Sequence, residues 1–302
     1  MNILIVGLVI IAKKHIFAIK EIDKDANIYA IRSKKNASII SGVNNIYSLD
    51  DININFDFCI ISNPTSEHFN SISKYIKLNI PLFIEKPSLK NLEGAYDLVK
   101  KINKKNITTY VALNLRFHPI IKFLKIYIKD KRVIEANIYC GSYLPDWRPN
   151  INYSKNYSAI ENLGGGVHLD LIHEIDYSIW LFGVPSKSIS VKKKISDLNI
   201  DSKDLAVYHL LYDDKIVNIS LNYYRKYPKR EIELVLDDEI IKADLLNNNI
   251  KNHKAEIIYS IDINKNYTYK EQMKYFYDLI KNNKKSISSF QDSLEILKIC
   301  LK

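Results

Sequence analysis

The first 119 residues carry the pattern that most constrains the fold, because short β-branched runs alternate with stretches of helical periodicity. The runs that we predict as strands span residues 2–6, 27–31, 56–61, 81–84 and 108–113. Helical patterns lie between them, for example over residues 67–78 and 89–104. Such alternation is typical of a parallel sheet with crossover helices. We therefore predict an α/β, doubly wound domain over residues 1–119.

Beyond residue 119 the predicted strands follow one another without helices between them. After a helix over residues 120–129, they span residues 133–140, 188–194, 205–212, 216–223, 230–236 and 255–261, with one helix at about 168–182. Polar and apolar residues alternate over 231–236, as in an antiparallel sheet with one wet face. Helices over 269–281 and 291–301 end the chain and can pack back on the first domain. We predict an α+β domain over 120–302 with a large, mostly antiparallel open sheet.

Composition limits the classes of function. No apolar run approaches the roughly 20 residues of a membrane-spanning helix, and the first residues lack the basic lead of a signal peptide. The cysteines, Cys59, Cys140 and Cys300, are far apart and form no metal-ligand spacing. The formal charge is +10, but the lysines are scattered in pairs along the chain. We expect a cytoplasmic protein that binds no metal, nucleic acid or membrane, with a surface charge that favours an anionic ligand.

The turns after the first two predicted strands could bind a dinucleotide. Gly7-Leu8-Val9-Ile10-Ile11-Ala12 resembles the GxGxxG turn, except that Val9 replaces the glycine that lets the backbone approach a pyrophosphate. Gly7, Ile10 and Ile11 are the candidate contacts, although a turn without ligand fits equally well. Arg32 and Ser33 stand where a carboxylate usually binds the adenosine ribose, so they suit the 2′-phosphate of NADP. An ordinary basic loop that includes Lys34 and Lys35 remains an alternative.

Polar residues also follow the next two strands of the predicted parallel sheet. They form the segments Ser62-Asn63-Pro64-Thr65, with His68 nearby, and Glu85-Lys86-Pro87. Ligands bind along the carboxyl edge of such sheets. A lysine between a carboxylate and a proline can donate to a substrate oxygen as a point charge. Lys86 is therefore our candidate catalytic residue.

A glycine triplet, residues 164–166, precedes the helix predicted over 168–182. Helical spacing places Asp170 and His173 along one side of that helix. A histidine beside carboxylates is a credible general base. Two alternatives remain open: metal binding by His168, Asp170 and His173, and a polar helix face exposed to solvent.

Taken together, these segments resemble the Gfo/Idh/MocA family of glucose-fructose oxidoreductases and inositol dehydrogenases over essentially the whole chain. The resemblance rests on the first turn with His15, Asn63-Pro64 with His68, Glu85-Lys86-Pro87, Asn114-Leu115-Arg116-Phe117-His118-Pro119, and the glycine triplet with Asp170, His173 and Asp176. It implies an N-terminal Rossmann domain and hydride transfer between a sugar carbon and NAD or NADP. It also implies a homodimer or homotetramer formed through the C-terminal sheet.

The resemblance assigns roles to individual residues. Lys86 would polarise the reacting hydroxyl or carbonyl, while His173, assisted by Asp170, exchanges its proton. Arg116 would join these residues at the substrate. The cofactor would lie along Ser62, Asn63, Pro64, Thr65, His68, Glu85 and Asn114. Besides Val9, one departure matters: the step from Asp170 to His173 is three positions, where the family has a step of four.

Residues 141–149, followed by Tyr153 and Tyr157, resemble a family branch associated with surface-glycan biosynthesis. The candidate substrate contacts are Tyr143, Trp147, Arg148 and Tyr157. Aromatic faces with an arginine suit a sugar or nucleotide-sugar that carries phosphate or carboxylate, and a packed loop is the alternative. A non-catalytic descendant that binds a sugar nucleotide or a protein partner is the alternative function.

Overall fold

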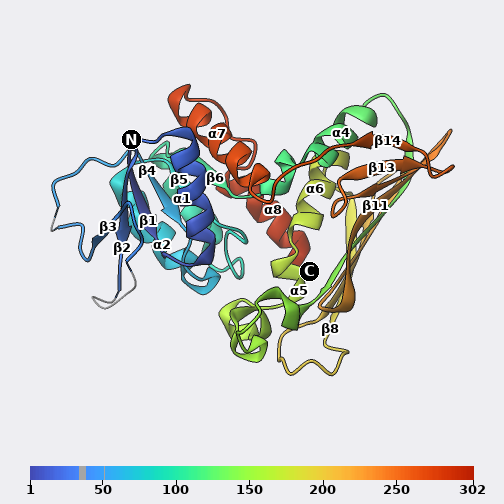
Figure 1. The fold of residues 1–302 in the computed structure, drawn as a ribbon, viewed down its shortest axis with the longest axis horizontal. Coiled ribbons are helices and arrows are strands. Elements are labelled where there is room, and N and C mark those ends of the chain that lie inside the picture. The colour runs from blue at the N-terminus through green and yellow to red at the C-terminus, as the bar shows by residue number, and fades with distance from the viewer. Residues whose placement is uncertain (34–38, 51) are drawn as a thin grey trace. The chain divides into compact units, whose positions relative to one another are not determined.

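The computed structural model describes residues 1–33, 39–50 and 52–302. It divides into two compact units: unit 1 is Met1–Asn114 with Lys265–Leu297, and unit 2 is Leu115–Asn264 with Lys298–Lys302. Unit 1 contains a six-stranded parallel sheet and unit 2 an eight-stranded, mostly antiparallel sheet (Figure 1). The predicted fold class is confirmed.

The sheet of unit 1 has the strand order β3-β2-β1-β4-β5-β6. Its strands are β1 (Asn2–Val6), β2 (Asn27–Ile31), β3 (Val43–Ile46), β4 (Phe58–Ile61), β5 (Leu82–Ile84) and β6 (Thr109–Val111). The strand order reverses at β1, whose Val6 pairs with Ile31 of β2 and Ile61 of β4. Ligands of such sheets bind outside the carboxyl ends of the strands at this switch point. The segments after β1 and β4 therefore occupy the position of a ligand site.

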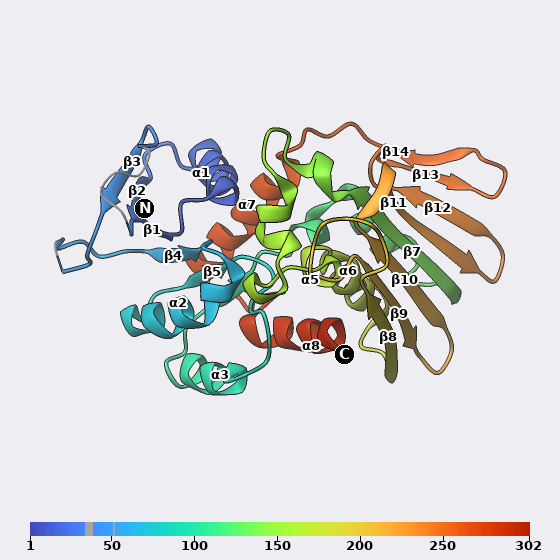
Figure 2. The same ribbon diagram turned by 90° about the horizontal axis from the view of Figure 1, so that it is seen from below.

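Helices cover both faces of this sheet. They are α1 (Ile10–Ile22), α2 (His68–Tyr75), α3 (Ala95–Lys104) and α7 (Tyr267–Lys281), while α8 (Phe290–Leu301) belongs to unit 1 only up to Leu297. Helices α1 and α7 pack side by side on one face, and α2 and α3 lie on the other (Figure 2). Phe276 of α7 meets Phe58 and Phe83 of the sheet edge-to-face. Helix α3 starts later than predicted because Gly94, at its N-cap, has a left-handed φ of +65°.

The sheet of unit 2 has the order β14-β13-β12-β11-β7-β10-β9-β8. Its strands are β7 (Val133–Tyr143), β8 (Lys187–Lys193), β9 (Leu205–Leu211), β10 (Ile216–Asn222), β11 (Tyr224–Leu236), β12 (Ile240–Asp244), β13 (Asn249–Asn252) and β14 (Ile257–Ser260). Only β7 and β10 pair in parallel among the described strands of this sheet. Strand β11 starts at Tyr224, well before the predicted residue 230. The prediction missed its first residues because an irregularity in the pairing with β7, between Tyr224 and Lys229, interrupts the alternation that marks a strand.

Helices α4 (Pro119–Tyr127), α5 (Val167–Asp170) and α6 (His173–Phe182) lie on one face of this sheet (Figure 1). The single helix predicted over 168–182 is wrong. At Leu171 the backbone turns to ψ +33°, outside the helical region, and separates α5 from α6. Within the described ranges, no helix is long and apolar enough to cross a membrane.

Candidate active site

The turn after β1 is packed tightly against the segment after β4. Gly7 has φ +89°, and a Cβ atom there would lie 2.3 Å from the backbone of Asn63. The Ser62 hydroxyl donates a hydrogen bond to the Gly7 carbonyl at 2.8 Å. Both the left-handed backbone and this close approach require glycine. The structure thus brings three predicted cofactor residues together at the switch point.

Val9 does not distort this turn. It is the N-cap of α1 and has an extended backbone, with φ −96° and ψ −175°, which any residue can adopt. The Val9 and Ile10 side chains are 43% and 59% exposed. The first turn of α1 contains no acidic residue, and no described side chain caps it. Its N–H groups, including that of Ile11, are therefore suited to an anion such as a pyrophosphate.

Arg32 and Ser33 directly follow β2. The Arg32 N–H donates to the Ile46 carbonyl at 2.8 Å. Its guanidinium Nη1 is buried and has no hydrogen-bond partner within the part of the chain that the structure describes. A buried guanidinium donor without an acceptor suits a phosphate. Lys34 and Lys35 lie outside the described residues.

Glu85 points into unit 1. It is buried, and its Oε1 lies 2.5 Å from Nε2 of the fully buried His15. Its Oε2 accepts a hydrogen bond from the backbone N–H of Lys86 at 3.1 Å. Burial lowers the pKa of the neighbouring Lys14, whereas the negative charge of Glu85 opposes this shift. The carboxylate therefore holds the backbone that carries Lys86, whose peptide bond to Pro87 is cis.

His68 connects the segments after β4 and β5. It is buried at the start of α2, and its Nε2 lies 2.9 Å from the Asn63 carbonyl. Its Nδ1 lies 3.0 Å from the carbonyl of Pro87 and 3.2 Å from that of Ser88. Burial lowers the pKa of His68, and these hydrogen bonds and the charge of Glu85 oppose the shift. Sequence reasoning could not place His68 and His15 around Glu85 because they come from separate helices.

The other predicted cofactor residues of unit 1 lie at the same carboxyl edge or near it. Pro64 precedes a short 3-10 helix that begins at Thr65. The Asn63 side chain donates to Ser71 at 2.8 Å. Asn114 is buried, and its amide donates to the Thr268 hydroxyl at the start of α7, also at 2.8 Å. Asn63 and Asn114 thus have internal partners for their side-chain N–H groups.

In unit 2, Asp170 forms a hydrogen bond with the predicted substrate loop. Its two carboxylate oxygens accept hydrogen bonds from the hydroxyls of Tyr157, at 2.9 Å, and Tyr223, at 2.5 Å. Trp147 packs edge-on against Tyr223, with ring centroids 5.2 Å apart, and the Arg148 guanidinium lies 5.2 Å from the Tyr157 ring centre. The charge of Asp170, together with burial, raises the pKa of Tyr157. Sequence reasoning missed Tyr223, which belongs to no motif.

The glycine triplet allows this loop to pack closely. A Cβ atom on Gly165 would lie 2.3 Å from the carbonyl oxygen of Tyr157. Asp170 ends α5 and His173 begins α6. The prediction that one continuous helix presents both residues is therefore wrong, although both are buried in unit 2. Tyr143 is the last residue of β7, immediately before the segment with Trp147.

Arg116 forms a buried ion pair with Asp176. The guanidinium Nε lies 2.9 Å and Nη2 2.5 Å from Oδ1 of Asp176, and Nε also lies 3.2 Å from Oδ2. Asp176 is fully buried and Arg116 is 7% exposed. Within the described ranges, no three His, Cys, Asp or Glu side chains are grouped to hold a metal ion.

Comparisons with known proteins agree with this geometry. Residues 1–113 match the Gfo/Idh/MocA family model, described as an oxidoreductase family with an NAD-binding Rossmann fold. UDP-N-acetylglucosamine 3-dehydrogenase of Acidithiobacillus ferrooxidans is 23% identical over 206 residues, which are 67% of this chain and 60% of that protein. Inositol 2-dehydrogenase of Rhizobium meliloti is 24% identical over 135 residues, 44% of this chain and 39% of that protein. The match thus spans less than two thirds of either relative.

Solved structures share the fold over the whole chain. The structure of the Acidithiobacillus ferrooxidans enzyme, GnnA, has a TM-score of 0.82 at 19% identity and covers 100% of this chain and 95% of its own. GenD2 from gentamicin A biosynthesis, in complex with NAD, has a TM-score of 0.82 at 14% identity, with coverages of 100% and 92%. The resemblance predicted from the sequence is confirmed: residues 1–113 match the Gfo/Idh/MocA family model with its NAD-binding Rossmann fold, and the solved structures share the fold of the whole chain.

Proposed function

We propose that this protein is an NAD(P)-dependent oxidoreductase that transfers a hydride between the cofactor and a hydroxyl or carbonyl carbon of a sugar or nucleotide-sugar. The observation that carries the proposal is the switch point of unit 1, where Gly7 is packed against Asn63 and Lys86 follows the next strand. The relatives that act on UDP-N-acetylglucosamine and inositol support this substrate class. We place the reaction in the cytoplasm and in surface polysaccharide or glycan biosynthesis.

The residues of unit 1 fit a dinucleotide. Gly7, Ile10 and Ile11 would hold the pyrophosphate at the uncapped start of α1. Arg32 and Ser33 would hold a 2′-phosphate, which favours NADP over NAD because Nη1 of Arg32 needs an acceptor. The remaining cofactor would lie along Ser62, Asn63, Pro64, Thr65, His68, Glu85 and Asn114. When bound, the nicotinamide ring supplies or accepts the hydride.

Charged, polar and aromatic side chains would bind the substrate and move its proton. Lys86 would bind the reacting oxygen and stabilise negative charge on it as a point charge. His173, assisted by Asp170, would remove or return the hydroxyl proton. The sugar or its phosphate would be held by Tyr143, Trp147, Arg148 and Tyr157. Arg116 would support the substrate site through its ion pair with Asp176.

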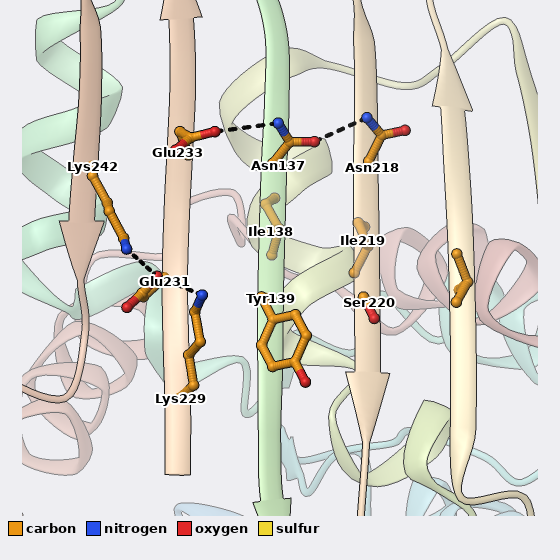
Figure 3. Close-up of a pocket in the computed structure, with 11 residues that line it drawn as sticks. Asn137, Ile138, Tyr139, Asn218, Ile219, Ser220, Lys229, Glu231, Glu233 and Lys242 are labelled. Atoms are coloured by element: carbon orange, nitrogen blue, oxygen red, sulfur yellow. Dashed lines mark hydrogen bonds and ion pairs between the residues drawn. The ribbon is translucent and has the colours of Figure 1, made fainter. Parts of the chain in front are cut away.

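The bare face of the unit 2 sheet would form a homodimer or homotetramer interface. No helix within the described part of unit 2 lies on this face (Figure 1). Its centre carries a polar rung in which Asn137 connects Glu233 with Asn218 (Figure 3). Ile189 and Val191, 46% and 47% exposed, add an apolar strip at β8. Such a strip favours burial against a second copy. Sedimentation should show an oligomer that Val191→Glu dissociates, and a monomeric wild-type protein would contradict this assignment.

Cofactor titration combined with turnover tests the proposed function. NADPH should bind more tightly than NADH, and Arg32→Gln should remove this preference. Sugar nucleotides, including UDP-N-acetylglucosamine, and free polyols should be oxidised or reduced by the wild-type protein. Lys86→Ala should abolish turnover and leave cofactor binding intact. Binding of neither cofactor would refute the proposal.

A non-catalytic, ligand-binding protein is the second candidate, because the exposed Val9 side chain stands where glycine normally admits the pyrophosphate. Val9→Gly separates the two functions. Since the turn already has an extended backbone at this position, the substitution removes bulk without changing the turn. A Val9→Gly variant that binds NADPH where the wild-type protein does not would favour the non-catalytic function. Equal binding by both proteins would favour the enzyme.

A further inference from the structure

Two buried histidines of unit 1, His15 and His68, contact the segment Glu85-Lys86-Pro87 from two sides. They come from different helices, α1 and α2, and neither belongs to the strand that carries the segment. All their hydrogen-bond contacts are with unit 1 itself. This arrangement gives them a task in addition to any contact with the cofactor.

His15 fixes the carboxylate that precedes Lys86. Its ring packs edge-on against Phe83 of β5, with centroids 4.9 Å apart, which places Nε2 beside Glu85. The other ring nitrogen, Nδ1, is buried without a hydrogen-bond partner among the described residues. The Nε2–H group therefore donates to Oε1 of Glu85, and this bond orients the whole carboxylate.

Glu85 connects His15 with the backbone of Lys86. Its second oxygen, Oε2, accepts the backbone N–H of Lys86 at 3.1 Å. A carboxylate held at one oxygen by His15 presents the other oxygen in one direction only. The peptide group from which the Lys86 side chain projects is thus fixed from α1, the helix that begins at the dinucleotide turn.

His68 fixes the other end of the segment. Its Nδ1 side faces the carbonyls of Pro87 and Ser88, and its Nε2 side faces the carbonyl of Asn63. All three partners can only accept, so a neutral ring donates on one side and a protonated ring on both. Asn63 in turn lies against Gly7. The contacts close a ring through the ends of β1, β4 and β5.

We propose that His15 and His68 are positioning residues that hold Lys86 in register with the dinucleotide turn. The inference rests on the proposed function for the role of Lys86, but the positioning itself does not depend on turnover. A positioned lysine matters because displacement of a reacting group by about 1 Å can lower a rate by about 100-fold. Glu85 acts as the link between His15 and the Lys86 backbone.

Amide hydrogen exchange of the full-length protein tests the positioning directly. Glutamine places a donor where Nε2 of histidine lies, and asparagine places one where Nδ1 lies. His15→Asn should therefore increase exchange at Glu85, Lys86 and Ser88 several-fold, whereas His15→Gln should not. His68→Asn and His68→Gln each break one side of the bridge, and both should increase exchange. His118→Gln is the matched control, because His118 is a buried histidine of unit 2.

The result that overturns the proposal is unchanged exchange at these amides in His15→Asn and in both His68 variants. Equal increases in His15→Asn and His15→Gln would also overturn it, because general loosening would then explain them. Thermal unfolding of each variant shows whether unit 1 remains folded. The His15→Asn and His15→Gln variants carry the same amide group and differ by one methylene, which moves the donor, so the pair stays informative if both proteins lose stability.

Steady-state kinetics with NADPH and UDP-N-acetylglucosamine provides a second readout. His15→Asn should lower kcat by about 10- to 100-fold with an unchanged Kd for NADPH, and His15→Gln should restore kcat. A weaker Kd with unchanged kcat would overturn the proposal, because it would make His15 a cofactor contact. If the wild-type protein turns over no substrate, the proposed function fails, and the exchange experiment alone decides whether His15 and His68 position Lys86.

Discussion

Breaking the ion pair between Arg116 and Asp176 should destabilise unit 2 by about 3–5 kcal/mol, the usual cost of leaving one buried charge without its partner. Asp176 is fully buried, and both of its carboxylate oxygens receive N–H groups of Arg116. Burial raises the pKa of Asp176 and Arg116 opposes the shift, so the pair is held together against its desolvation. Asp176→Asn removes the negative charge and leaves the guanidinium buried.

Urea unfolding followed by tryptophan fluorescence is the appropriate assay. The chain has two tryptophans, and both Trp147 and Trp180 lie in unit 2, so the signal reports on this unit. With a urea m-value of about 1–3 kcal/mol/M, the predicted loss lowers the midpoint by at least about 1 M. Asp130→Asn, at an exposed aspartate of the same unit, should change stability by less than about 0.5 kcal/mol.

The double variant Arg116→Met/Asp176→Leu provides a second comparison. Replacing both charges by apolar side chains should recover most of the stability lost in Asp176→Asn. An Asp176→Asn protein as stable as Asp130→Asn would refute the reasoning, because it would mean that water or another group already compensates the charge of Arg116.

Three further predictions follow from individual contacts. Gly7→Ala should destabilise unit 1 by about 2–5 kcal/mol. The left-handed backbone contributes about 1–2 kcal/mol and the overlap with Asn63 about 1–3 kcal/mol. An unchanged melting temperature, measured by circular dichroism, would contradict this prediction. Burial lowers the pKa of His118 and His168 to about 4, so their stabilisation is present above the ordinary value near 6.5 and is lost as the pH falls toward 4. At pH 4 each histidine should therefore lower the free energy of unfolding by about 3 kcal/mol relative to its value at a pH above about 6.5. Equal free energies of unfolding under these two conditions, measured by tryptophan fluorescence, would disprove this prediction. Tyr223→Phe leaves Oδ2 of Asp170 without this donor and should cost about 1–3 kcal/mol in the same assay, whereas an unchanged midpoint would show that the bond contributes nothing.

Elements with a buried, uninterrupted pattern could be predicted from the sequence. The bounds of β1 and β2 agree with their prediction, because both are runs with apolar residues at buried positions. Strand β3, with two asparagines in four residues, and strand β13, with one apolar residue in four, have too few apolar residues to stand out. The break at Leu171 depends on its backbone angles, which helical periodicity does not reveal.

The candidate site divides in the same way. Lys86, Asn63 and Gly7 could be predicted, because the carboxyl ends of parallel strands meet at one edge whatever the side chains are. The partners of the site residues could not. His15 and Glu85 are 70 residues apart, and Tyr223 and Asp170 are 53 apart, so only the folded chain brings them together.

Transfer of deuterium from carbon to cofactor is the most direct test of the proposed function. The protein would be incubated with NADP and UDP-N-acetylglucosamine deuterated on the sugar ring, and the reduced cofactor analysed by mass spectrometry. We predict deuterium in the nicotinamide ring with the wild-type protein and none with Lys86→Ala. Tight NADP binding without deuterium transfer from this or any other deuterated sugar nucleotide or polyol would contradict the account.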